Sequence, residues 1–221
     1  MKVLVLIAYL EATAAGRVDP SELITVHADF ASADGHSRFE VIEQDEDDHA
    51  PWERATARLR WLAERMITHS SNLATDLVIE RIGLDAVRSA GESIEGVEIH
   101  RWIDDQPAGS SGITNSVTAA GLATVLSRLW SRHLLSEADT ETALDLLAAN
   151  TWNDEIPRGL PPGTRVAHKN GWDTGIRHDA GIVLPEGRPP FVVSVLTTGL
   201  TDDDAKPLIA GVAAWAWDRL A

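Results

Sequence analysis

The sequence contains no cysteine among its 221 residues. It therefore forms no disulfide, no thiolate metal site and no cysteine nucleophile, and its redox compartment stays open. Basic residues are also scarce, because 19 Lys and Arg stand against 34 Asp and Glu, which gives a formal net charge of −15. Nucleic acids and anionic membrane surfaces bind basic patches, so this charge argues against both as partners. No run approaches the ~18 apolar residues of a membrane span.

The first 16 residues allow two interpretations. A single Lys precedes eight apolar residues and a small-residue pattern, as in a secretory signal. Val3, Ile7, Leu10 and Ala14 nevertheless repeat at helical spacing and Gly16 is a natural stop, so we predict a buried helix. The export signal is then not convincing. Localisation stays unknown: cytoplasmic for the sequence as it stands, exported if a signal precedes it.

Helical periodicity dominates the middle of the sequence. A helix over 52–68 is predicted, with Ala55, Leu59, Leu62 and Met66 on one apolar face. Thr118 and Ser136 are each suited to cap the helix that follows, because a hydroxyl oxygen accepts a backbone N–H of the first turn. The predicted helices span residues 52–68, 73–83, 84–90, 118–130 and 136–149, and residues 97–115 form a long loop.

The last third of the sequence predicts an antiparallel sheet. Strands over 165–169 and 178–183 flank a turn at 173–175, and a third strand follows over 191–196. A final helix begins with three aspartates, and its predicted buried stripe consists of Leu208, Val212, Trp215 and Leu220. This order predicts a single α+β domain over 1–221, with a helical lobe over about 50–150 packed on the sheet.

Lys169 is the first candidate for chemistry. It ends an apolar strand, and Asn170 and Gly171 follow, where a glycine lets a ligand approach the backbone. Arg177 lies across the turn, so two cations are expected to face one spot and to anchor a substrate carboxylate. The alternative is an edge strand with a solvated lysine. When the hairpin is considered without the other motifs, this alternative is favoured.

Residues 69–72 interrupt the helical pattern and are the second candidate. Two hydroxyls and a carboxamide at a break between helices can project into a cleft, or they can cap the next helix. Taken alone, this segment favours the cap. With Lys169 and with Lys2 at the start of an apolar helix, it forms the frame S-x-x-K, S-D-N, K-T-G of penicillin-recognising serine enzymes.

The sequence resembles this family over its whole length, above all the class A β-lactamases and related serine hydrolases. Residues 66–83 resemble the S-D-N segment, 166–183 the K-T-G strand with the strand after it, and 1–23 the helix that begins with the nucleophile motif. The resemblance implies the family's α+β fold, a helical lobe packed on an antiparallel sheet with the site between them, and serine hydrolase activity.

Three departures accompany the resemblance. The family's serine lies three residues before the motif lysine, so with Lys2 in that place it falls just upstream of Met1. The sequence as it stands is then an inactive, N-terminally shortened enzyme, and it also lacks the strands that precede this helix. A three-stranded sheet keeps an open edge, through which a homodimer is expected. Ile103 stands where class A enzymes have the Glu that activates the deacylating water, and Asp104 and Asp105 are the nearest carboxylates.

The resemblance also implies a role for each matching residue. Lys2 activates the serine that attacks a lactam, amide or ester carbonyl, and Ser70 passes a proton to the leaving nitrogen. Lys169 raises the local potential and attracts the substrate carboxylate. The implied substrate-binding residues are Asn72, Asn170, Gly171, Trp172 through its backbone N–H, and Arg177.

No cofactor is implied, and the histidines lack ligand spacing, which argues against a zinc site. His168 and His178 are interpreted as structural. The acidic run 43–48 is interpreted as a solvated linker, or as a weak cation site. The expected partner is a small molecule with a carboxylate, namely a β-lactam, peptide or ester. Two alternatives stay open: a non-catalytic relative that binds a peptide or cell-wall fragment, and a structural domain in which the motifs are coincidence.

Overall fold

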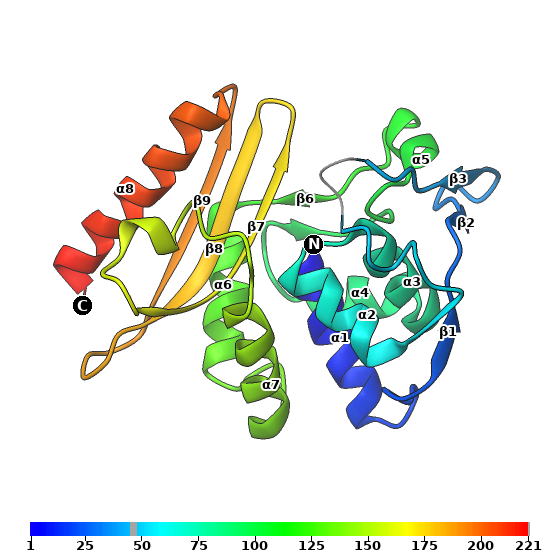
Figure 1. The fold of residues 1–221 in the computed structure, drawn as a ribbon, viewed down its shortest axis with the longest axis horizontal. Helices are drawn as coiled ribbons and strands as arrows, with labels where there is room; N and C mark the ends of the chain where they lie inside the picture. Colours follow the sequence, from blue (N-terminus) through cyan, green and yellow to red (C-terminus); the bar gives the residue numbers. More distant parts are fainter. Residues whose placement is uncertain (45–47, 221) are drawn as a thin grey trace. The chain divides into compact units, whose positions relative to one another are not determined.

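The computed structural model describes residues 1–44 and 48–220, and the chain divides into two compact units, Met1–Ser116 and Val117–Ala221 (Figure 1). Helices and an antiparallel sheet are both present, which confirms the predicted α+β class. The acidic run 43–48 lies partly outside the described residues. Within the described part of the chain, no helix has the length and apolar character needed to cross a membrane.

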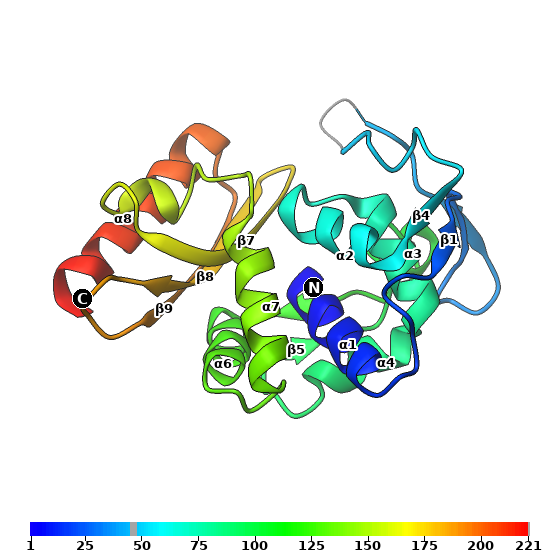
Figure 2. The same cartoon turned by 60° about the horizontal axis from the view of Figure 1, so that its bottom comes forward.

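The first unit is built around α1 (Lys2–Ala14), which is buried over residues 3–10. Three helices contact it: α2 (Leu59–Thr68), α3 (Asn72–Ile82) and α4 (Leu84–Gly91) (Figure 2). Because neighbours cover it on several sides, α1 needs no polar face, and the predicted buried helix is confirmed. Gly16, at φ +67°, turns the chain after it.

Short strands complete this unit. The antiparallel pairs are β1 (Leu23–Thr25) with β4 (Thr56–Arg58), and β2 (Asp29–Ala31) with β3 (Arg38–Glu40). The helix predicted from residue 52 was wrong at its start, because the backbone of β4 pairs with β1 and Ala55 is exposed. The predicted loop 97–115 contains β5 (Val97–Glu98) and α5 (Gln106–Ser110). The short strand β6 (Ser116–Val117) lies at the boundary of the units.

The second unit begins with two helices that the sequence predicted, α6 (Ala119–Trp130) and α7 (Glu137–Ala148). Thr118 accepts the backbone N–H of Gly121 at 3.0 Å, and Ser136 accepts that of Asp139 at 3.2 Å, so both hydroxyl caps are confirmed. α6 contacts the last two strands of the sheet, and α7 contacts the first.

The sheet of this unit has the order β7-β8-β9 and is antiparallel throughout. Its strands are β7 (Arg165–Asp173), β8 (Ile176–Leu184) and β9 (Phe191–Thr198). They are longer than predicted, and residues 170–172 lie inside β7 rather than after it. Gly175 makes the turn at φ +69°. β7 and β9 are both edge strands of this sheet, and a homodimer through an open edge stays a prediction.

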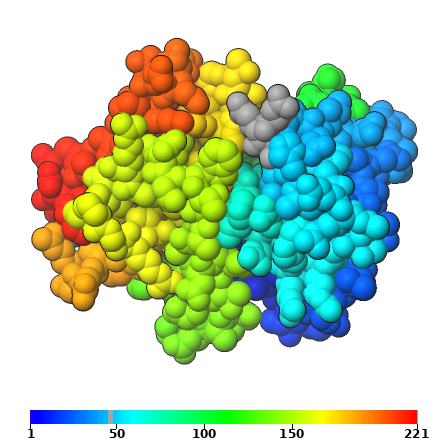
Figure 3. Space-filling model, viewed as in Figure 1, coloured from blue at the N-terminus to red at the C-terminus, as the bar shows by residue number. Residues whose placement is uncertain are grey.

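The last helix, α8 (Asp202–Leu220), packs on β8, β9 and the short helix η1 (Pro157–Gly159). The predicted buried stripe was wrong: its four members are 38% to 56% exposed, and the helix lies at the surface of its unit (red in Figure 3). The buried residues are Ala205, Ile209, Ala210, Ala213 and Ala216. Mostly small residues form the buried face of α8 because η1 packs very close to it. A Cβ on Gly159 would lie 1.9 Å from the carbonyl oxygen of Ala210.

Candidate functional site

Lys2 is the centre of the polar cluster in the first unit. Its Nζ donates to Asn72 Oδ1 at 2.7 Å, to Ser70 Oγ at 3.1 Å and to the Ser70 carbonyl oxygen. Ser70 has φ +60°, a conformation that costs a non-glycine residue about 1–2 kcal/mol. The tight turn between α2 and α3 thus aims the oxygens of Ser70 and Asn72 at the first residue of α1. The structure brings these three predicted residues together.

Ser71 has a different task from its neighbours. Its Oγ accepts the backbone N–H of Ala74 at 3.2 Å, and its carbonyl oxygen accepts the hydroxyl of Thr75 at 2.6 Å. It is 2% exposed and caps α3. The two interpretations of residues 69–72 therefore apply to different residues: Ser71 is the cap, and Ser70 and Asn72 face Lys2.

The two loop carboxylates also separate. Asn72 Nδ2 donates to Asp104 Oδ1 at 3.4 Å, so Asp104 belongs to the Lys2 cluster. Asp105 is fully buried and accepts the hydroxyl of Ser32 at 2.7 Å and the N–H groups of Ala33 at 2.7 Å and Ala108 at 3.1 Å. With its hydrogen bonds used this way, Asp105 caps α5 and ties residues 32–33 to this loop.

Asp76 is a residue that the sequence reasoning missed. It lies on α3, is fully buried, and its Oδ1 accepts the backbone N–H of Ile103 at 3.0 Å. Its Oδ2 has no hydrogen-bond partner among the described residues. Burial raises the pKa of Asp76 well above its usual value, and the hydrogen bond from Ile103 opposes this shift only in part. The sequence did contain a signal for this buried carboxylate, because Asp76 is a charged residue among the apolar positions of α3.

Replacing Asp76 by Asn is expected to remove the pH-dependent part of this residue's contribution to stability, because Asn has the same shape and carries no ionisable group. A carboxyl whose pKa rises on folding binds its proton more tightly in the folded state. Stability therefore falls as pH rises from about 4, the pKa of an unfolded Asp, through the raised folded value. Urea unfolding between pH 4 and 8 should show a flatter pH dependence in Asp76→Asn.

The matched control for this prediction is Asp85→Asn. Asp85 lies on α4, its side chain is 91% exposed, and it pairs with Arg88 at 2.7 Å. An exposed pair of this kind contributes about 0–1 kcal/mol, so this variant should keep the pH dependence of the unaltered protein. Identical pH profiles for Asp76→Asn and Asp85→Asn would contradict the raised pKa of Asp76.

In the second unit, Lys169 and Asn170 form a buried pair on β7. Lys169 Nζ donates to Asn170 Oδ1 at 3.1 Å and to the Asn170 carbonyl oxygen at 2.9 Å. The Asn170 Oδ1 also accepts Asn150 Nδ2 at 3.3 Å. At Gly171 a Cβ would meet no atom within 4 Å, so the space beside this backbone is open. A ligand can approach the strand at that position.

Arg177 lies on β8 opposite Trp172 and is 7% exposed. Its guanidinium stacks on the Trp172 ring at 5.2 Å and forms ion pairs of 3.0 Å with Glu155 and with Asp202. Side chains alternate along a strand, so Trp172 and Arg177 share one face and Lys169, three residues before Trp172, belongs to the other. The two side chains thus start from opposite faces of the sheet, and the expectation that both cations face one spot stays a prediction.

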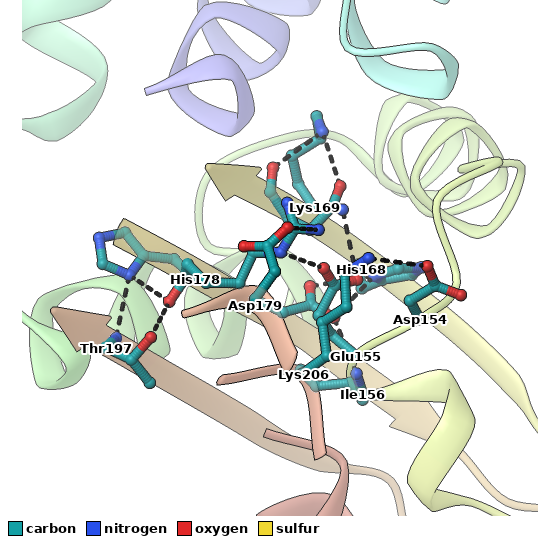
Figure 4. A network of polar contacts seen from close by, with 12 residues as sticks. Asp154, Glu155, Ile156, His168, Lys169, His178, Asp179, Thr197 and Lys206 are labelled. Carbon is teal, nitrogen blue, oxygen red and sulfur yellow. Dashed lines mark hydrogen bonds and ion pairs between the residues drawn. The ribbon is translucent and has the colours of Figure 1, made fainter. Parts of the chain in front are cut away.

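A second buried pair, which the sequence did not predict, lies beside Arg177. His168 Nδ1 is 3.0 Å from Asp179 Oδ1, both side chains are almost fully buried, and Asp179 Oδ2 accepts the N–H of Ile156 at 3.0 Å (Figure 4). His178 accepts the N–H of Thr197 at 3.1 Å, and burial lowers the pKa of its imidazole. Among the described residues, no three His, Asp or Glu side chains are grouped so as to hold a metal ion.

Together these features define a class of protein: an α+β chain with a Lys–Ser–Asn cluster at the start of a buried helix and a K-x-G edge strand in its sheet. The family described as "Beta-lactamase enzyme family" matches residues 1–220, and the chain belongs to this family.

Individual relatives agree with this assignment. The chain is similar to a β-lactamase of Streptomyces fradiae, at 31% identity over 150 residues, which are 64% of this chain and 48% of that protein. It is 28% identical to a β-lactamase of Bacillus subtilis (strain 168) over 74% of this chain and 58% of that protein. The chain thus spans about half the length of the curated relatives it matches.

Solved structures show the same fold. A variant of an ancestral class A β-lactamase of Gram-negative bacteria superposes with a TM-score of 0.81 at 26% identity, over 98% of this chain and 82% of that chain. The structure of PBP-A superposes with a TM-score of 0.74 at 24% identity, over 99% of this chain and 80% of that chain.

Proposed function

We propose that this chain is the main part of a serine hydrolase that transfers the acyl group of a β-lactam, amide or ester to a serine. The observation that carries the proposal is the cluster in which Lys2 binds Ser70 and Asn72. The serine itself is proposed to lie three residues before Lys2, upstream of Met1. Residues three apart share a helix face, so a helix extended by one turn would place that hydroxyl beside the Lys2 side chain.

The proton transfers follow from this cluster. In its neutral form, Lys2 removes the proton of the serine hydroxyl as the oxygen attacks the carbonyl carbon. When the C–N bond breaks, Ser70 gives its hydroxyl proton to the leaving nitrogen. Ser70 recovers a proton from the Lys2 ammonium, which is 3.1 Å away, so the cluster returns to its starting state. The product is an ester between the serine and the acyl group.

Other residues bind the substrate in this proposal. Asn72 holds the amide of the substrate side chain, and Lys169 attracts the substrate carboxylate, with Asn170 as a further donor. The backbone N–H of Trp172, beside the open space at Gly171, supplies one donor of the oxyanion hole. Loss of one such donor typically costs about 100 to 1,000-fold in rate. Arg177 adds positive potential that Glu155 and Asp202 partly neutralise.

Deacylation is proposed to be slow. The side chain of Ile103 has no group that activates water. The backbone N–H of Ile103 donates to Asp76. Asp104, the next residue along the chain, carries a carboxylate, but its Oδ1 already accepts Asn72 Nδ2. The acyl-enzyme should therefore accumulate. Among the solved structures of similar fold, a point mutant of PBP-A is described as an acyl-enzyme complex with penicillin G, which makes penicillins suitable probes.

The test compares two forms of the protein: the chain from Met1, and an extended chain that adds the upstream codons with a Ser three residues before Lys2. Both are exposed to a fluorescent penicillin, and the intact mass is measured. We expect an adduct of one penicillin on the extended chain alone, and none when that Ser is replaced by Ala. If neither form is labelled, the lactam hydrolase is ruled out. Retention of the unreacted penicillin by both forms would then indicate a non-catalytic binding relative.

A further inference from the structure

Glu155 is a buried carboxylate that contacts Asn170, and none of the proton transfers proposed above uses it. It lies just before η1 and is 1% exposed. Its Oε2 accepts Asn170 Nδ2 at 3.4 Å, and its Oε1 lies 3.0 Å from Arg177 Nε, an ion pair without the alignment of a hydrogen bond. Two residues with proposed roles in substrate binding thus meet at one carboxylate.

We propose that Glu155 is a positioning residue for Lys169, and that it acts by fixing the orientation of the Asn170 amide. The inference rests on the proposed function only in that Lys169 binds the substrate there. Glu155 lies outside the three motifs that resemble the family.

The physical reason is that a carboxylate only accepts hydrogen bonds. Glu155 therefore requires the NH₂ group of Asn170 on its side, which leaves Asn170 Oδ1 to face Lys169 Nζ at 3.1 Å and Asn150 Nδ2 at 3.3 Å. A side chain at 155 with an NH₂ of its own permits the opposite orientation of Asn170. That orientation points an NH₂ at the Lys169 ammonium, and two donors repel each other.

The charges around Glu155 come from every element packed against it. Burial raises the pKa of Glu155 first, and Asp179 on β8 adds to this, whereas Arg177 on β8 and Lys206 on α8 lower it. His168 pairs with Asp179, and Asp154 pairs with Lys206 (Figure 4). Asp202 forms a second ion pair with Arg177. Arg177 thus favours the carboxylate form of Glu155. Because Glu155 also accepts the Asn170 amide, a change in the charge of Glu155 affects that amide.

The sequence supplies an unusually direct probe, because its only lysines are Lys2, Lys169 and Lys206. Lysine labelled with ¹³C at Cε should give three assignable NMR signals. In Glu155→Gln we expect the Lys169 signal to move and the Lys2 signal to stay. The matched control is Asp154→Asn, which removes a neighbouring exposed carboxylate paired with Lys206 at 3.1 Å. That variant should move the Lys206 signal and leave the Lys169 signal in place.

An unmoved Lys169 signal in folded Glu155→Gln overturns the proposal. Should that variant not fold, the unaltered protein provides the second measurement. Its Glu155 carboxyl carbon and the Lys169 Cε are followed together through acid titration. We expect both signals to change at the same midpoint, because protonated Glu155 donates a hydrogen bond and releases the Asn170 amide. A Lys169 signal that does not change while Glu155 titrates overturns the proposal.

Penicillin labelling separates this proposal from the proposed function. In the extended chain, Glu155→Gln should slow acylation at low penicillin concentration by about tenfold, the usual effect of losing one positioning interaction of about 1.4 kcal/mol, and Asp154→Asn should stay within about twofold. Equal labelling of Glu155→Gln and the unaltered extended chain overturns the role of Glu155 and leaves the hydrolase intact. A moved Lys169 signal without labelling of any form supports Glu155 and rules out the lactam hydrolase.

Discussion

Replacing Lys2 by Met in the extended chain is expected to lower the rate of penicillin labelling by about 100 to 10,000-fold, the usual contribution of a general base. Lys2 contacts Ser70 and Asn72, and it is the only lysine of the described first unit. In the extended chain its amine is expected to lie beside the proposed serine. The measurement is the rate of adduct formation by intact mass at several penicillin concentrations. Lys206→Met, which removes an ammonium from α8, should label at the unaltered rate.

Lys2→Arg decides between a base and a fixed positive charge. An arginine keeps the charge and donates hydrogen bonds to Ser70 and Asn72, but it stays protonated in proteins and cannot accept the serine proton. We expect Lys2→Arg to be as slow as Lys2→Met. Labelling by Lys2→Arg at the unaltered rate would contradict the base and would indicate that Lys2 acts through its charge alone.

Replacing Ile103 by Glu in the extended chain is expected to shorten the lifetime of the penicillin adduct by about 100-fold or more, because the new carboxylate activates the water that hydrolyses the ester. The backbone of residue 103 is held by the buried Asp76, so the new side chain starts from a fixed position. The lifetime is measured by mass after excess penicillin is removed. Adduct formation itself should change little.

The control for this prediction is Ile103→Gln, which has the shape of Glu but no basic oxygen. If Gln shortens the adduct lifetime as much as Glu does, the gain comes from a more polar loop and not from a base. Rapid turnover of penicillin by the extended chain with Ile103 in place, without adduct accumulation, would contradict slow deacylation and would point to Asp104 as the base.

The buried character of α1 and the limits of several other elements were predictable because their signals are local. Gly16 and Gly175 adopt positive φ where the chain turns, and the Thr118 and Ser136 hydroxyls cap the helices that follow them. Each signal needs only the few residues around it. The contact of Lys2 with Ser70 and Asn72 was predictable only through the motif frame, because 68 residues separate Lys2 from Ser70.

The amino-acid sequence by itself determined the α+β class, the order of the longer helices and of the three strands of the last sheet, and the chemical groups near the start of α1. Tertiary structure decided the rest: the pairing of β4 with β1 that shortened α2, the small-residue face of α8, and the burial of Asp76 and Glu155. Periodicity reports that a face is apolar, but close packing decides which face is covered. From the sequence alone, a carboxylate is expected to be solvated. Folding removes the water and brings partners such as Arg177 to it, and these partners set both its pKa and its role.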